Sequence, residues 1–166
     1  GEPTAQFEFA LALLKAAKRE GLHCCIETSG HSSWQNFALL LPFVDLFLFD
    51  YKESDAKRHL DYVGQSNEVI LRNLKALHDL GAKIQLQCPI VPGYNDREDH
   101  LQGICAIAKT LPELVGVRLL AYHPLGTDKL RKLGSPAEKK PLGAPNMDEL
   151  SRWRRVLTLQ GIRIVT

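Results

Sequence analysis

The stretch Asp45-Leu46-Phe47-Leu48-Phe49-Asp50 places four apolar residues in an unbroken run between two carboxylates. Strands of parallel sheets are covered on both faces, and they are typically continuous apolar runs rather than alternating ones. The run therefore predicts a buried strand over 45–50 that ends in a polar residue. The rest of the chain repeats this order of strand, polar residue at the carboxyl end, and helix.

Helical and strand patterns alternate on both sides of this run. Apolar residues at helical spacing, bounded by caps, glycines and prolines, predict the helices, and short apolar segments between them predict the strands. In chain order the pattern predicts helix 4–20, strand 23–28, helix 33–41, strand 45–50, helix 67–80, strand 83–91, a helix with its buried stripe over 101–111, and strand 116–122. A loop over 124–145, a last helix and a closing strand 162–165 follow. Asn146 and Glu149 open the last helix, and its predicted inner face consists of Met147, Leu150, Trp153 and Leu157.

Strands that alternate with helices of this length form βαβ units and hence a parallel sheet. Right-handed crossovers place every helix on the outer side if the sheet curls. Four internal strands are too few to close a barrel of eight. The sequence therefore predicts an α/β fold with an incomplete barrel, and residues 1–166 form one domain because no linker or repeat divides them.

The composition excludes some classes of protein. A net charge of +2 argues against a large nucleic-acid or membrane surface, and no apolar run is long enough to span a bilayer. The four cysteines, at 24, 25, 88 and 105, contain no CxxC pair, so they predict neither a disulfide framework nor a metal site. A reducing, cytoplasmic setting fits this cysteine usage best.

Polar residues follow the predicted strands at their carboxyl ends, where parallel α/β folds bind ligands. Carboxylates there suit an ammonium group or ribose hydroxyls, and Lys52 suits a carboxylate, so the ligand would be zwitterionic and hydroxyl-bearing. Each residue alone has a structural explanation: end-of-strand bonding for Glu27 and Asp50, solvation for Lys52, a turn cap before Pro124 for His123. Their common position favours a binding site. The candidates are Gly1, Glu2, Glu27, Thr28, Asp50, Lys52, Gln87 and His123.

Five segments in the chain stand out by their order and spacing: Gly1-Glu2-Pro3, Ile26-Glu27-Thr28-Ser29-Gly30, Phe49-Asp50-Tyr51-Lys52, Ile90-Val91-Pro92-Gly93-Tyr94-Asn95-Asp96 and Leu120-Ala121-Tyr122-His123-Pro124-Leu125-Gly126. Together they closely resemble the glycyl-radical enzyme activating enzymes, the pyruvate formate-lyase activating enzyme type within the radical SAM superfamily. The resemblance covers essentially the whole chain, and the fourth and fifth segments are its most specific part.

The resemblance implies a partial (β/α)6 TIM-like barrel, of which this chain would be the carboxyl-terminal part, truncated at its N-terminus. It also implies S-adenosylmethionine and a [4Fe-4S] cluster held by a CxxxCxxC loop. In such enzymes a 5′-deoxyadenosyl radical abstracts hydrogen from a glycine of a partner glycyl-radical enzyme, with electrons from a flavodoxin or ferredoxin-type reductant. We expect the chain to be a monomer that binds neither nucleic acid nor membrane.

The same resemblance assigns roles to the candidate residues. Gly1 and Glu2 would belong to the turn that meets the methionine amino group. Glu27, Thr28 and Asp50 would surround the methionyl end and the ribose. Lys52 would approach the methionine carboxylate, and His123 would lie along the adenosine.

Two departures from the family pattern qualify these roles. Better-known members carry Arg where Gln87 stands and Asp where Glu27 stands, and a glutamine carries no fixed charge for a carboxylate. A partner other than pyruvate formate-lyase accommodates both changes.

CxxxCxxC is absent from these 166 residues, so we expect this chain alone to be catalytically inactive. Two alternatives remain open. One is another radical SAM enzyme, such as an anaerobic ribonucleotide reductase activator or a small-molecule enzyme. The other is a non-catalytic α/β domain that binds a nucleoside or sugar in the same cleft.

Overall fold

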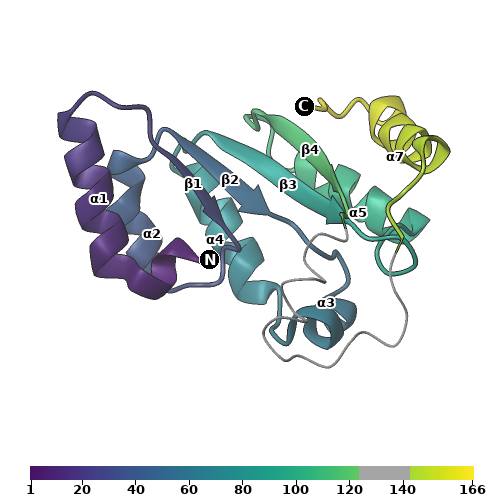
Figure 1. Cartoon of the computed structure of the whole chain (residues 1–166), viewed down its shortest axis with the longest axis horizontal. Helices are drawn as coiled ribbons and strands as arrows, with labels where there is room; N and C mark the ends of the chain where they lie inside the picture. The colour runs from purple at the N-terminus through teal and green to yellow at the C-terminus, as the bar shows by residue number, and fades with distance from the viewer. Residues whose placement is uncertain (124–142) are drawn as a thin grey trace.

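The computed structural model describes residues 1–123 and 143–166, and a sheet of four parallel strands forms its centre (Figure 1). The strands lie in the order β1-β2-β3-β4, so each pairs with its neighbour in the chain. This arrangement confirms the predicted α/β fold with a parallel sheet. The predicted loop over 124–145 falls outside the described residues except for 143–145. The strands are β1 Cys25–Thr28, β2 Leu46–Asp50, β3 Ile84–Ile90 and β4 Gly116–Ala121.

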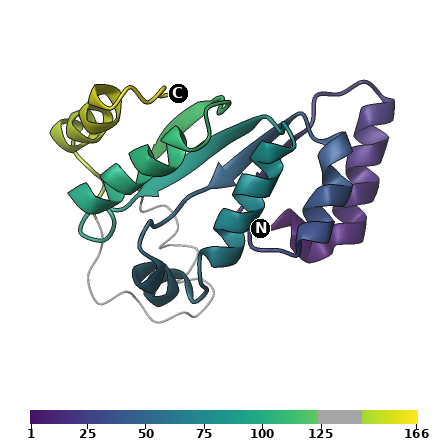
Figure 2. The same cartoon turned by 180° about the vertical axis from the view of Figure 1, so that it is seen from behind.

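Among the described residues, helices cover one face of the sheet and none lies over the other, the open face, as the two opposite views show (Figures 1 and 2). Helices α4 and α5 lie against the covered face; α1 and α2 pack together beside β1, and α7 packs on α5. None of the described helices is long and apolar enough to cross a membrane. The helices are α1 Phe7–Arg19, α2 Trp34–Leu40, α3 Ala56–Val63, α4 Glu68–Asp79, α5 Glu98–Lys109 and α7 Met147–Leu159, with short 3₁₀ helices at Pro3–Gln6 and Leu41–Phe43.

Strand β2 shows how the sheet divides into two faces. Phe47 and Phe49 are fully buried beneath the helices, whereas Leu46 and Leu48 on the open face are only half-buried. The prediction that this strand is covered on both faces therefore holds for one face only, because the helices lie on one side. Alternation also places Asp50 on the open side, at the carboxyl end of the strand.

The last helix confirms one local prediction and corrects two others. Asn146 and Glu149 form a reciprocal capping box at the start of α7, as their spacing predicted. Trp153 and Leu157 are buried, but Met147 is 72% exposed, so its assignment to the inner face was wrong. The predicted closing strand over 162–165 is reduced to one parallel bridge between Val117 and Ile164.

Helix α3 was not predicted, although it carries clear capping signals. The Asp55 side chain accepts a hydrogen bond from the Arg58 N–H at 2.8 Å, and Gly64 ends the helix with a φ of 80°. Its apolar residues Leu60, Tyr62 and Val63 are exposed, so no inward stripe marked it as a helix. This helix matters because it forms one wall of the cavity described next.

Candidate functional site

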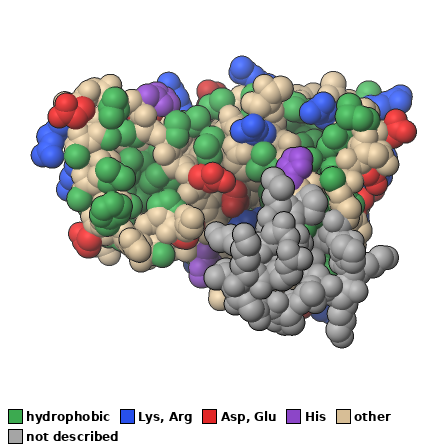
Figure 3. Space-filling model, viewed as in Figure 1, with side chains coloured by type: hydrophobic (Ala, Val, Ile, Leu, Met, Phe, Trp, Pro, Cys, Tyr) green, Lys and Arg blue, Asp and Glu red, His purple; other side chains and the backbone are tan. Residues whose placement is uncertain are grey.

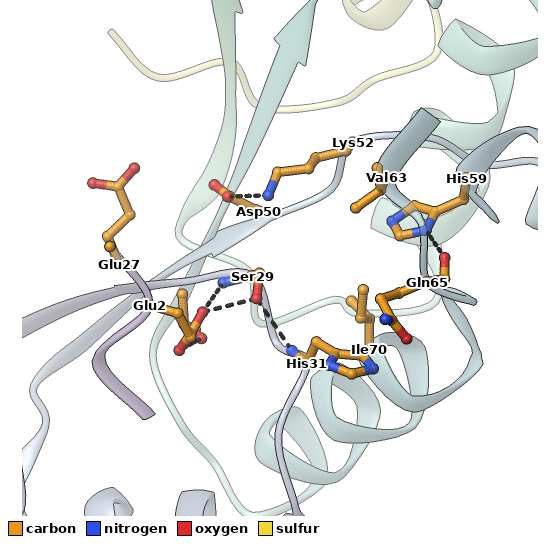
Figure 4. Close-up of a pocket in the computed structure, with 12 residues that line it drawn as sticks. Glu2, Glu27, Ser29, His31, Asp50, Lys52, His59, Val63, Gln65 and Ile70 are labelled. Carbon is orange, nitrogen blue, oxygen red and sulfur yellow. Dashed lines mark hydrogen bonds and ion pairs between the residues drawn. The ribbon is translucent and has the colours of Figure 1, made fainter. Parts of the chain in front are cut away.

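A cavity of about 620 Å³ lies at the carboxyl ends of β1 and β2, facing α3 and the start of α4 (Figure 4). Its volume is in the range of small-molecule and cofactor sites. Six of the eight predicted site residues line it. The lining consists of Gly1, Glu2, Glu27, Thr28, Ser29, His31, Asp50, Lys52, His59, Val63, Gln65 and Ile70.

The Glu2 carboxylate joins the start of the chain to the end of β1. One oxygen accepts hydrogen bonds from the Thr4 N–H, the Thr4 hydroxyl and the Thr28 hydroxyl, at 3.2, 2.8 and 2.9 Å. The other accepts from the Ser29 N–H and hydroxyl, at 2.8 and 2.7 Å. With both oxygens engaged, the Glu2 side chain holds the wall of the cavity in place, and the Gly1 backbone beside it remains exposed.

Burial opposes the ionisation of Glu2, but the donors from Ser29, Thr4 and Thr28 outweigh it and hold its pKa below the ordinary value. Because the pKa of Glu2 is lower in the folded state, its ionisation stabilises the fold at any pH above the unfolded-state pKa, near 4.5. This stabilisation is lost as the pH falls through the lower, folded-state pKa. The Glu2 carboxylate is therefore negatively charged at neutral pH.

We expect Glu2→Gln to lower the free energy of unfolding by about 1–3 kcal/mol at neutral pH, because an amide nitrogen cannot accept the Ser29 or Thr28 hydrogen bonds. Urea unfolding at a series of pH values measures this. The difference from the unaltered chain should shrink in acid, where Glu2 itself becomes protonated. A difference that stays constant at all pH values would contradict the assignment.

The turn after β1 approaches the sheet so closely that its central residue must be glycine. Gly30 has a φ of 75°, and a Cβ built on it would lie 2.2 Å from the Phe49 ring. The Asn73 side chain fixes the turn by donating to the Gly30 and Ser32 carbonyls at 2.8 and 2.9 Å. This turn presents Thr28 and Ser29 to the cavity.

Asp50 and Lys52 form an ion pair inside the cavity, with Lys52 Nζ 3.1 Å from Asp50 Oδ2. Both side chains are partly exposed, so the pair contributes little stability. An incoming carboxylate can therefore draw the ammonium group away at small cost. Glu27 also lines the cavity; it is exposed and extends away from the bonded residues in Figure 4.

The structure does not bring the other two predicted residues into this cavity. Gln87 lies beside Asp50 in the register of β2 and β3, and its Nε2 atom is buried without a hydrogen-bond partner among the described residues. His123 follows β4, is exposed, and does not line the cavity. Their contacts with a ligand stay predictions.

Several lining residues were missed because they belong to α3 and its surroundings. His59 is buried, and its Nδ1 lies 2.7 Å from the Gln65 carbonyl oxygen. A carbonyl only accepts, so Nδ1 carries a proton. Val63 and Ile70 add apolar surface beside it. The Asp55 and Gly64 caps of α3 were the signals that could have revealed this wall. The missed residues are His59 and Val63 in α3, Gln65 and Ile70 just after it, and Ser29 and His31 in the turn after β1.

The charge of the cavity favours a cationic ligand. Among the side chains of the described residues that line it, Glu2, Glu27 and Asp50 supply three carboxylates, and Lys52 supplies an ammonium group. The open face seen in Figure 3 carries acidic side chains near its centre. Such a lining attracts sulfonium and ammonium groups and repels polyphosphates, while Lys52 gives a carboxylate one place to bind.

A buried ionic cluster lies behind Lys52. Glu53 is 1% exposed, receives three hydrogen bonds from the Arg97 terminal nitrogens at 3.1–3.2 Å, and accepts hydrogen bonds from the Ser54 and Asp55 N–H groups. Burial lowers the pKa of His100 to about 4, so His100 is neutral at neutral pH and its Nδ1 accepts the Ser54 N–H at 3.0 Å. The cluster fixes the segment that follows Lys52.

The residues present do not fit an iron-sulfur cluster. Cys24, Cys88 and Cys105 are buried on the helix side or within helices, and Cys25 is exposed on β1. Across residues 1–123 and 143–166, no three His, Cys, Asp or Glu side chains come together as a metal site. We therefore assign this part of the chain no step that passes through a cluster.

The chain is similar to known proteins in sequence and in fold. The model of the Radical SAM superfamily matches residues 1–102. The isethionate sulfite-lyase activating enzyme of Nitratidesulfovibrio vulgaris is 40% identical over 150 residues, which cover 89% of this chain and 47% of that protein. The trans-4-hydroxy-L-proline dehydratase activating enzyme of Clostridioides difficile is 32% identical, with 94% of this chain and 52% of that protein covered. The chain thus spans about half the length of these curated relatives.

A solved structure supports the fold. A domain of pyruvate-formate lyase-activating enzyme from Bacteroides vulgatus ATCC 8482 superposes with a TM-score of 0.81, at 22% identity, over 99% of this chain and 93% of that chain. The four parallel strands are therefore part of a partial TIM-like barrel of the radical SAM type. From the family match and these relatives, the chain belongs to the radical SAM superfamily, within the glycyl-radical enzyme activating enzyme family.

Proposed function

We propose that this chain is the S-adenosylmethionine-binding part of a glycyl-radical enzyme activating enzyme. The observation that carries the proposal is the cavity formed where β1 and β2 end, whose described lining holds three carboxylates and Lys52. Family membership implies S-adenosylmethionine and a [4Fe-4S] cluster. Such a cluster would supply the electron for cleaving the sulfonium, and the residues described here would hold the nucleoside and not the cluster.

Within this proposal the chain binds and orients the nucleoside. The Gly1 backbone and the Glu2-braced turn meet the methionine amino group, and Lys52 binds the methionine carboxylate. Asp50 and Glu27 accept hydrogen bonds from ribose hydroxyls or from the ammonium group. His123, which lies outside the cavity lining, is proposed to lie along the adenosine, and Gln87 is given no ligand contact.

The protein partner in this proposal is a glycyl-radical enzyme. Relatives at 40% and 36% identity activate isethionate sulfite-lyase and choline trimethylamine-lyase, whereas a pyruvate formate-lyase-activating enzyme from Streptococcus mutans is 29% identical. Together with Glu27 and Gln87 at positions where better-known members differ, this favours a partner other than pyruvate formate-lyase. Hydrogen abstraction from peptides that copy different glycyl loops, by the complete enzyme, would identify it.

Titration calorimetry with S-adenosylmethionine tests the nucleoside site. We expect Asp50→Ala to weaken binding about tenfold or more, because it removes a carboxylate that faces the ligand. Asp79→Ala is the matched control, since Asp79 is a surface carboxylate on α4 that pairs with Lys75 at 2.8 Å. Equal affinities for the two variants, or tight binding of an unrelated metabolite in the cavity, would support a non-catalytic binding domain instead.

A further inference from the structure

The loop between β3 and α5 turns the chain so that the Asn95 side chain lies against the ends of the strands. Val91-Pro92-Gly93-Tyr94 forms a tight turn in which the Tyr94 N–H donates to the Val91 carbonyl at 3.1 Å. Proline at the second position and Gly93 with a φ of 79° at the third are what a type II turn requires. The turn reverses the chain, so Asn95 lies against the strand ends and not in solvent.

The Asn95 amide makes three hydrogen bonds near those strand ends. Oδ1 accepts the Val91 N–H at 2.7 Å, and Nδ2 donates to the Pro89 and Lys52 carbonyls at 2.8 and 2.7 Å. The residue is 5% exposed. One N–H donor on one side and two carbonyls on the other leave only one orientation of the amide that satisfies all three.

The hydrogen bond from Asn95 to the Lys52 carbonyl lies just beyond the last hydrogen bond between β2 and β3. The last hydrogen bond between β2 and β3 in this region runs from the Tyr51 N–H to the Gln87 carbonyl, at 2.8 Å. Lys52 is the next residue, and its backbone carbonyl is held by Asn95. Its side chain enters the nucleoside cavity, where Nζ lies 3.1 Å from Asp50.

We propose that Asn95 is a positioning residue for Lys52, setting the backbone from which the ammonium group reaches the methionine carboxylate. The inference rests on the proposed function, because it takes that carboxylate as the partner of Lys52. It gives a role to the Val-Pro-Gly-Tyr-Asn segment, which a hydrogen bond from Asn95 joins to Lys52 in the cavity lining.

The test compares two ligands that differ only at the carboxylate: S-adenosylmethionine and its decarboxylated analogue. NMR titration of the isolated chain measures both affinities, including weak ones. Asn95→Asp keeps the acceptor for Val91 but turns a carboxylate oxygen toward two carbonyls, so it displaces Lys52. In Asn95→Asp we expect the preference for S-adenosylmethionine over the analogue to fall about tenfold, while the affinity for the analogue changes little. We expect the same fall in Lys52→Ala, which removes the ammonium group itself. Asn95→Ala removes the same bond without repulsion and should give a smaller fall.

Asn73→Asp is the matched control for a general loss of stability. Asn73 is equally buried and also donates to two backbone carbonyls, those of Gly30 and Ser32, but it does not touch Lys52. Asn73 fixes a turn in the cavity wall, so Asn73→Asp should weaken both ligands alike and leave the preference for S-adenosylmethionine over the analogue as in the unaltered chain. A fall equal to that of Asn95→Asp would show that loosening alone is responsible and would overturn the inference.

The remaining outcomes separate the two proposals. If Lys52→Ala reduces the preference and both Asn95 variants do not, the positioning role is wrong and the proposed function stands. If the unaltered chain shows no preference for S-adenosylmethionine, or Lys52→Ala leaves it unchanged, the assignment of Lys52 in the proposed function fails. The Asn95 inference then fails with it.

Discussion

Replacing Gly30 with alanine is expected to lower the free energy of unfolding by about 3–5 kcal/mol, enough to leave much of the chain unfolded. Two effects add. The left-handed backbone at Gly30, with a φ of 75°, costs a residue with a Cβ about 1 kcal/mol or more. The new methyl group would also lie 2.2 Å from a fully buried Phe49 ring, which has no room to retreat.

Gly21→Ala separates these two effects. Gly21 has a φ of 71° at the end of α1, and a Cβ there would meet nothing within 4 Å. We expect it to lose about 1 kcal/mol, from the backbone conformation alone. Urea unfolding followed by circular dichroism measures both variants. Equal losses would mean that the contact between Gly30 and Phe49 is not as close as the structure shows.

Glu53→Ala is expected to have an effect of similar size, about 3–5 kcal/mol, because it removes one partner from a buried ionic cluster. The Arg97 guanidinium would lose its buried carboxylate, and the Ser54 and Asp55 N–H groups would lose their acceptor. Burial opposes the ionisation of Glu53, but Arg97 and the Asp55 N–H outweigh it and keep its pKa below the ordinary value. The carboxylate is therefore charged at neutral pH, where unfolding in urea should be measured.

Asp99→Ala is the matched control for this cluster. Asp99 also accepts from Arg97, at 2.9 Å, but its side chain is 59% exposed. An exposed pair contributes less than about 1 kcal/mol, so this variant should stay close to the unaltered chain in stability. If Glu53→Ala lowers the free energy of unfolding as little as Asp99→Ala does, water must already reach the Glu53 carboxylate.

The main elements of the fold could be predicted because their signals are local. The apolar run 45–50, the capping box of Asn146 and Glu149, and the glycines at 21 and 81 each act through near neighbours in the chain. Met147 and the strand over 162–165 were predicted wrongly, because exposure and strand pairing depend on distant parts of the structure.

The candidate site was predicted in part for a related reason. Parallel strands end at one edge, so the residues after β1 and β2 had to lie close together, and they do. Helix α3 exposes most of its apolar residues, so neither it nor His59 could be found from periodicity. The role of Asn95 depends on a hydrogen bond to Lys52, 43 positions away, and no spacing in the sequence reveals such a contact.

A crystal structure of this chain with S-adenosylmethionine tests the central claim most directly, since the claim concerns where the nucleoside binds. We expect the methionyl group between Gly1, Asp50 and Lys52, with the carboxylate on Lys52 Nζ and the ion pair to Asp50 opened. Electron density for the ligand in the separate cavity beside Tyr62 and Tyr94, or ligand that leaves the pair of Asp50 and Lys52 untouched, would contradict it.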